Sequence, residues 1–136
     1  MDPLIQQVVE AYRREETLYA HILATVEEQC DIMAKRPDPA TVLQLCRQVE
    51  EVMVEITGIE RDLEPAKERW EEIKNQLPKE LDSSLASIQD AIEKITRGQA
   101  QVLDSLKDYV LKEQQTAESA RATVNAHRAR EAYGTQ

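Results

Sequence analysis

The chain has 136 residues, a formal net charge of -9, one Trp, four Tyr and no Phe, and it is rich in strong helix formers. Its length indicates one domain, and its acidity argues against nucleic-acid binding, because phosphate groups repel such a chain unless it carries a local basic patch. No apolar run of roughly 18 residues is present, so we expect no membrane insertion. The N-terminus lacks the features of a secretory signal, so we expect a cytoplasmic protein.

The first predicted helix begins at the N-terminus. Asp2 is a suitable N-cap, Pro3 suits the first helical position, and Lys35 with Arg36 places cations at the C-terminal end. Glu15 and Glu16 interrupt the apolar stripe. They lie either at the edge of the stripe or at a local gap in packing, and we favour the edge, because long side chains reach solvent from there. Heptad-spaced apolar residues define the stripe: Ile5, Tyr12, Tyr19, Val26 and Met33.

The sequence Pro37-Asp38-Pro39 ends this helix and begins another, with Asp38 as N-cap. Because the connection is short, the two helices should be antiparallel neighbours. Cys30 and Cys46 lie eight residues either side of Asp38, so a disulfide between them is geometrically conceivable. In a reducing compartment we expect two free thiols that behave as small buried apolar side chains.

The second predicted helix, from about Pro39 to Gln76, has the most regular heptads of the chain. The apolar stripe is widest in residues 42–59, where we expect the deepest burial. We interpret Pro65 as a kink in a continuous helix rather than a break between two helices. We interpret Trp70 as a core anchor. Eleven successive heptad positions are apolar: Val42, Leu45, Val49, Val52, Ile56, Ile59, Leu63, Ala66, Trp70, Ile73 and Leu77.

Pro78 ends the second helix, and a third begins between Leu81 and Ser84. Its stripe continues to Tyr109 with one polar member, Gln99. Gly98 beside it is either a tolerated surface glycine or a flexible point next to a polar register residue, and we favour the tolerated glycine. These patterns predict an all-α fold: an elongated antiparallel three-helix bundle or coiled coil in residues 1–111.

Residues 112–136 have a different character and form a C-terminal extension. Only Ala117, Ala120 and Val124 continue an apolar stripe, and the segment carries a charge of +1, with 4 Lys+Arg against 3 Asp+Glu. The extension should either be disordered or form a helix that requires a partner.

No residue pattern predicts catalysis, a metal site or a cofactor. A di-iron bundle needs Glu-x-x-His, but Leu18 and Val124 stand three residues before His21 and His127. His21 lacks the nearby Lys of a phosphotransfer histidine, and the three glycines are isolated rather than forming a phosphate loop. We therefore expect a protein that is not an enzyme.

Two stretches are similar to a known family. Residues 59–70, Ile-Glu-Arg-Asp-Leu-Glu-Pro-Ala-Lys-Glu-Arg-Trp, and the late Arg130-Glu131-Ala132-Tyr133-Gly134 resemble the FlgN family of flagellar export chaperones. The resemblance implies a cytoplasmic chaperone for type III export. Such a chaperone binds the C-terminal helices of hook-associated (hook-filament junction) proteins, prevents their premature assembly and delivers them to the export apparatus.

If the resemblance holds, the extension is the candidate client-binding segment, because an exposed amphipathic helix can accept another helix in a groove. The alternative is a structural coiled-coil adaptor or self-associating subunit without chaperone activity. Either interpretation permits a homodimer. The expected client contacts are Val110, Ala117, Ala120, Val124 and Tyr133.

Overall fold

The computed structural model describes residues 2–133, and this part of the chain is all-α: it is 93% helical and contains no strand. The expected fold class is confirmed at this level. None of the described helices is long and apolar enough to cross a membrane. The helices in chain order are α1 (Pro3–Lys35), α2 (Pro39–Asp62), α3 (Glu64–Glu68), α4 (Trp70–Ile73), a single 3-10 turn η1 (Lys74–Gln76), and α5 (Glu80–Tyr133).

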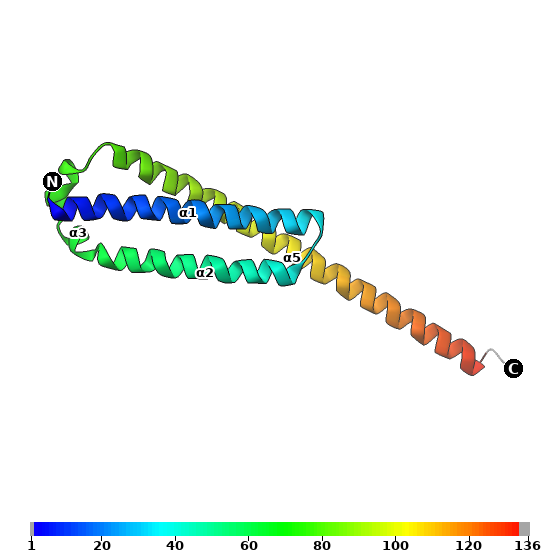
Figure 1. The fold of residues 1–136 in the computed structure, drawn as a ribbon. Helices are drawn as coiled ribbons and strands as arrows, with labels where there is room; N and C mark the ends of the chain where they lie inside the picture. Colours follow the sequence, from blue (N-terminus) through cyan, green and yellow to red (C-terminus); the bar gives the residue numbers. More distant parts are fainter. Residues whose placement is uncertain (1, 134–136) are drawn as a thin grey trace. The chain divides into compact units, whose positions relative to one another are not determined.

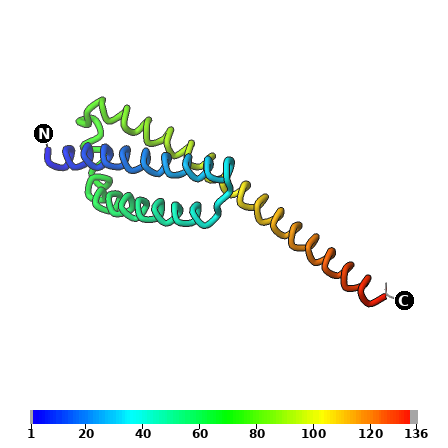
Figure 2. Tube along the Cα trace, turned by 45° about the vertical axis from the view of Figure 1, so that its right-hand side comes forward, coloured from blue at the N-terminus to red at the C-terminus, as the bar shows by residue number. Residues whose placement is uncertain are grey.

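Local capping explains where the first two helices begin. Asp2 Oδ1 accepts a hydrogen bond of 2.9 Å from the backbone N–H of Leu4, and Pro3 is the first helical residue. Asp38 caps α2 in the same way, accepting from the N–H of Thr41 at 3.2 Å and from its hydroxyl at 2.6 Å. The break between Lys35 and Pro39 is therefore confirmed, and α1 and α2 run side by side in opposite directions (Figures 1 and 2).

The chain divides into two compact units, Met1–Val102 and Leu103–Gln136. In the first unit, the beginning of α5 joins α1 and α2 in a common core. One cluster near the middle combines Leu18, Ile22 and Val26 of α1 with Val49 and Ile56 of α2 and Ala91 and Ile95 of α5. The other cluster contains Ile5, Val8, Leu63, Ala66, Ile73 and Leu81.

The second predicted helix is not continuous. It ends at Asp62, and Leu63, with φ -85° and ψ -5°, is the cap residue between α2 and α3. Pro65 has no N–H to donate to the carbonyl of Arg61, so the normal hydrogen-bond ladder is interrupted here. The carbonyl of Asp62 instead accepts a hydrogen bond of 3.3 Å from Gln7 Nε2 of α1. The expectation of a kinked, continuous helix is therefore wrong.

Beyond this interruption most of the predicted core positions remain buried, but Trp70 does not. A second departure at Arg69, with ψ 17°, separates α3 from α4, and Trp70 is 36% exposed instead of forming a core anchor. Ile73 is the buried residue of α4, with 1% exposure. Met53, expected in the wide buried stripe of α2, is 40% exposed. Burial is therefore not greatest in residues 42–59, since Leu63, Ala66 and Ile73 are buried as fully as Val42.

Gly98 lies at a close approach between α5 and α1. A Cβ added there would be 2.6 Å from Cγ1 of the buried Val26, so this is not a tolerated surface glycine. Cys30 Sγ donates to the Gly98 carbonyl at 3.5 Å, whereas Cys46 Sγ accepts from Gln29 Nε2 at 3.2 Å. Both cysteines are free thiols, as expected, and each contacts a different neighbour.

Candidate interaction surface on the C-terminal helix

The expected client-binding residues all lie on α5, and all are exposed. The extension is helical through Tyr133, while Gly134, part of one family-like stretch, lies outside the described residues together with 135 and 136. From Val110 to Tyr133 every described side chain is exposed, and α5 has no buried residue after Val102. This helix therefore presents apolar side chains without forming a core of its own.

Helical phase brings four of the five expected residues to one face. Val110, Ala117 and Val124 are seven residues apart, and Ala120 lies one turn from Ala117 and Val124. Tyr133 follows Val124 by nine residues, about two and a half turns, so it lies on the opposite face.

Two further apolar residues extend this face toward the N-terminus. Leu103 precedes Val110 by seven residues and is 53% exposed, and Leu106, four before Val110, is partly exposed. Sequence reasoning missed both because it assigned them to the third helix of the bundle. Their heptad spacing to Val110 is the signal that could have identified them. We call this set the tail stripe: Leu103, Leu106, Val110, Ala117, Ala120 and Val124.

Cations accompany the tail stripe on one side. Lys107, Arg121 and Arg128 each follow a stripe residue by four positions, one helical turn, and Gln114 occupies the equivalent place after Val110. Within the described part of α5 beyond Val102, the one contact of this type joins His127 Nε2 to Glu131 Oε1 at 3.0 Å, and it is an ion pair only if His127 is protonated. The three cations therefore make no ion pair within this helix.

A second polar feature lies in the interior of the first unit. Glu15, expected at a solvent-facing edge, is only 2% exposed, and its Oε1 has no hydrogen-bond partner. Burial raises the pKa of Glu15 to about 8, and a hydrogen bond to Glu60 and the charge of Glu60 act in the same direction. The edge interpretation was wrong because α2 and α3 bring Glu60 and Lys67 to this point of α1.

Near neutral pH Glu15 holds a proton and Glu60 is ionised. The hydrogen bond from Glu15 lowers the pKa of Glu60, and Lys67 Nζ lies 2.9 Å from Glu60 Oε2. Protonated Glu15 therefore donates to an ionised Glu60 that is neutralised by Lys67. Burial, and then the nearby carboxylates, raises the pKa of Tyr12 and of Tyr19, so both phenols stay neutral.

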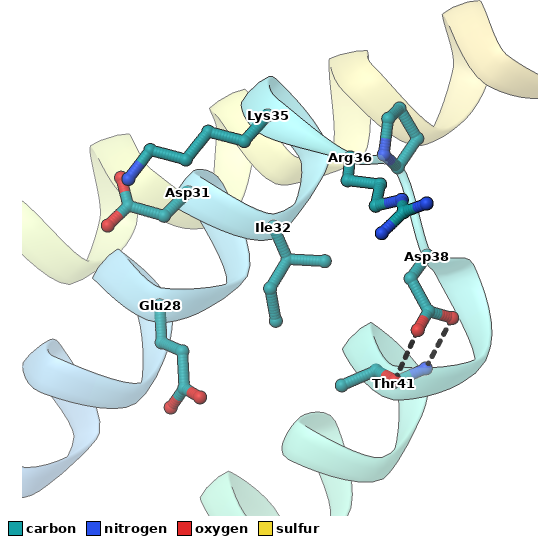
Figure 3. Close-up of a pocket in the computed structure, with 8 residues that line it drawn as sticks. Glu28, Asp31, Ile32, Lys35, Arg36, Asp38 and Thr41 are labelled. Carbon is teal, nitrogen blue, oxygen red and sulfur yellow. Dashed lines mark hydrogen bonds between the residues drawn. The ribbon is translucent and has the colours of Figure 1, made fainter.

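Two of the surface cavities in the first unit are candidate ligand sites. One, of about 220 Å³, is lined by Val8, Tyr12, Leu63, Ala66, Lys67 and Trp70, and it includes neither carboxyl of the Glu15–Glu60 pair. The other, of about 500 Å³, lies at the α1–α2 turn (Figure 3). There Asp38 is engaged in capping through Thr41, whose hydrogen bonds lower the pKa of Asp38. Both acidic and basic side chains line this open cavity, so it favours no single ligand charge.

Among residues 2–133, no group of three or more His, Cys, Asp or Glu side chains is arranged to hold a metal ion. A comparison of the chain with protein-family models, with curated proteins and with solved structures finds no match.

Proposed function

We propose that this protein is a cytoplasmic flagellar type III export chaperone that binds hook-associated (hook-filament junction) proteins and prevents their premature assembly. The resemblance of residues 59–70 and 130–134 to the FlgN family supports the class. The observation that carries the binding role is the tail stripe, an apolar face on a helix that is exposed from Val110 to Tyr133. In this proposal residues 1–111 form an antiparallel three-helix bundle that serves as the scaffold.

The physical basis of capture is the burial of one apolar helix face against another. A single exposed helix without a core gains little from its own packing, because most helical stability in proteins comes from burying an amphipathic face. A client helix that packs against the tail stripe supplies this burial. While bound, the client helix cannot contact its neighbours in the assembled filament junction. The export apparatus then receives the chaperone–client complex.

Truncation after Leu111 tests this proposal most directly. The truncated chain should keep the first unit folded, measured by circular dichroism and urea unfolding, and should lose co-purification with hook-filament junction proteins. Capture equal to that of the full chain would refute the proposal.

A point-variant pair gives a finer version of this test. Ala117→Glu with Val124→Glu places charge in the tail stripe, and Ala122→Glu with Ala126→Glu places the same charge on the far side of the helix. Only the first pair should abolish capture, since only it interrupts the apolar face.

A structural adaptor or self-associating subunit is the second candidate, and one observation favours it. Leu43 and Val54 of α2 are 59% and 72% exposed, and their spacing of eleven residues places them on the same face of the helix. Such a face suits packing between bundles. Size-exclusion chromatography with light scattering separates the candidates. A stable high-order oligomer or filament favours the adaptor, and a monomer or weak dimer that captures a junction protein favours the chaperone.

A further inference from the structure

The cations beside the tail stripe define a charged edge. Lys107, Arg121 and Arg128 recur at heptad-compatible positions, and Gln114 between them is uncharged, so this edge contains no carboxylate. In helix pairs, charges at such edge positions determine which partner is accepted and in which orientation. The charge of this edge therefore indicates the charge that a partner helix should have.

Some cations of the first unit are paired with helical carboxylates, whereas Arg47, Arg61 and Arg97 there are not. Lys107, Arg121 and Arg128 likewise make no ion pair in the described part of α5. Unpaired cations retain their charge for an incoming group. The neutralised lysines are Lys67 with Glu60 at 2.9 Å, Lys74 with Glu71 at 2.6 Å, and Lys94 with Asp90 at 2.9 Å.

A second copy of this chain fits the edge poorly. In an antiparallel pair of tails, edge positions of the same kind face each other, so the cations would meet cations or Gln114. In a parallel pair they would meet Tyr109, Thr116 and Thr123, which offer no negative charge. Each copy also carries a net charge of -9, which opposes association at long range.

An anionic membrane also fits poorly. Membrane-surface helices bury bulky side chains such as Trp, Phe and Leu. The second half of the tail stripe offers only Ala117, Ala120 and Val124. Small residues instead permit the close approach of another helix.

We propose that the tail stripe accepts an acidic amphipathic helix of another protein, whose carboxylates flank its apolar face and pair with Lys107, Arg121 and Arg128. This inference rests on the proposed capture function and adds the chemical class of the captured helix. Apolar burial supplies most of the affinity, and the charged edge supplies the selection between helices.

Two synthetic four-heptad peptides test the inference. They share the same apolar positions and differ only in carrying Glu or Lys at the flanking positions. The full-length chain is titrated with each peptide by calorimetry at low salt. We expect the Glu peptide to bind about tenfold more tightly, because two or three exposed ion pairs together give a factor of this order. Higher salt should reduce the difference.

A charge-reversed variant and a matched control complete the design. Arg121→Glu with Arg128→Glu should remove or invert the preference for the Glu peptide. Lys112→Glu with Arg130→Glu changes the net charge equally. Nine residues, or about two and a half helical turns, separate Lys112 from Leu103 and Arg130 from Arg121, so both residues lie on the side of the helix away from the charged edge. This control should retain the preference. Circular dichroism verifies that both variants remain helical.

Each other outcome overturns the inference. Equal affinity for the two peptides, binding of neither, or an unchanged preference in the Arg121→Glu, Arg128→Glu variant excludes charge selection at this edge. Binding to anionic phospholipid vesicles in preference to the Glu peptide would assign the surface to a membrane. Loss of client capture on truncation after Leu111, combined with equal peptide affinities, would refute only the charge selection. Unchanged capture after truncation would refute the proposed function itself.

Discussion

Glu15 makes the stability of the first unit depend on pH. Its pKa is 4.5 in an unfolded chain and about 8 in the folded one, so between these values the folded state binds the extra proton. The free energy of unfolding therefore falls as pH rises from about 4.5 to 8 and is level outside this window. The pKa of Glu60 is lowered on folding, so its effect on stability has the opposite sign and occurs at lower pH. The stability that ionised Glu60 contributes is lost as pH falls below about 4.5.

Substituting Glu15→Gln should remove this pH dependence. The amide can donate to Glu60 as the protonated carboxyl does, without a proton to lose. Between about pH 5.5 and pH 8.5 the parent chain should lose about 3 kcal/mol of stability that the variant keeps. Urea unfolding at several pH values measures the difference.

Glu16→Gln is the matched control for this variant, since Glu16 is adjacent but not fully buried. Its stability should follow the parent profile. A Glu15→Gln variant with the same slope as the parent would show that Glu15 is not the titrating group.

The burial of Glu15 beside Glu60 could not be predicted from the sequence, because its neighbours are distant in the chain. Heptad phase places residue 15 on the stripe of α1, but Glu60 and Lys67 are about 50 residues further along the chain. Only the packing of α2 and α3 against α1 makes them neighbours. From the sequence alone, a charged residue on an apolar stripe could therefore lie either at an exposed edge or in a buried polar contact.

Helix ends were predictable because they depend on local chemistry. Asp2 and Asp38 each cap a helix with the side-chain carboxylate, and the proline that follows each is the first helical residue. Both helix starts were predicted correctly. The heptad of the second helix still identifies buried residues beyond Asp62, namely Leu63, Ala66 and Ile73. Trp70, which lies between the interruptions at Arg69 and Lys74, is the exception at 36% exposed.

The contact at Gly98 leads to a prediction about helix packing. Gly98→Ala gains helix propensity, about 1 kcal/mol. The added methyl group would nevertheless meet Val26 at 2.6 Å, and Val26 is buried and stiff because it is β-branched. We expect a net loss of about 1–2 kcal/mol in the free energy of unfolding, measured by urea titration.

Gly58→Ala is the control, since its nearest atom would be Arg61 Nη2 at 3.9 Å, and it should stabilise the chain by about 0.5–1 kcal/mol. If Gly98→Ala also stabilised the chain, α5 would not approach α1 this closely in solution. Adding Val26→Ala to Gly98→Ala should cost less than the sum of the two single losses.

At the scale of the whole molecule, the two units differ in burial. The first unit contains the buried apolar core, and the second unit has no buried residue among those described. The apolar positions of the C-terminal extension could be predicted because part of the heptad survives there: Val110, Ala117, Ala120 and Val124 share a face, although Glu113 occupies the position between Leu106 and Ala120. Tyr133 was included from its place in a family-like stretch and lies on another face. Leu103 and Leu106 were assigned to the bundle because the sequence alone does not show that the last buried residue of α5 is Val102.

Hydrogen exchange should distinguish the two units. Every described side chain from Val110 to Tyr133 is exposed, and such a helix opens readily, so backbone amides in residues 103–133 should exchange much faster than those of α1 and α2. Mass spectrometry of deuterium uptake at neutral pH measures this along the chain. Equal protection of both segments would mean that the tail helix is already covered in the isolated protein, by itself or by a second copy.

The short connection between α1 and α2 has a consequence for the order of folding. Only residues 36–38 separate the two helices, so the contacts next to the turn, such as the 2.9 Å hydrogen bond from Gln29 Nε2 to the Val42 carbonyl, are local in sequence and close a small loop. Glu15 and Glu60 meet farther from the turn, and Lys67 belongs to α3. During synthesis the hairpin can therefore pair before α5 emerges from the ribosome. The residues Leu81, Ala91 and Ile95 then complete both apolar clusters on a surface that already exists.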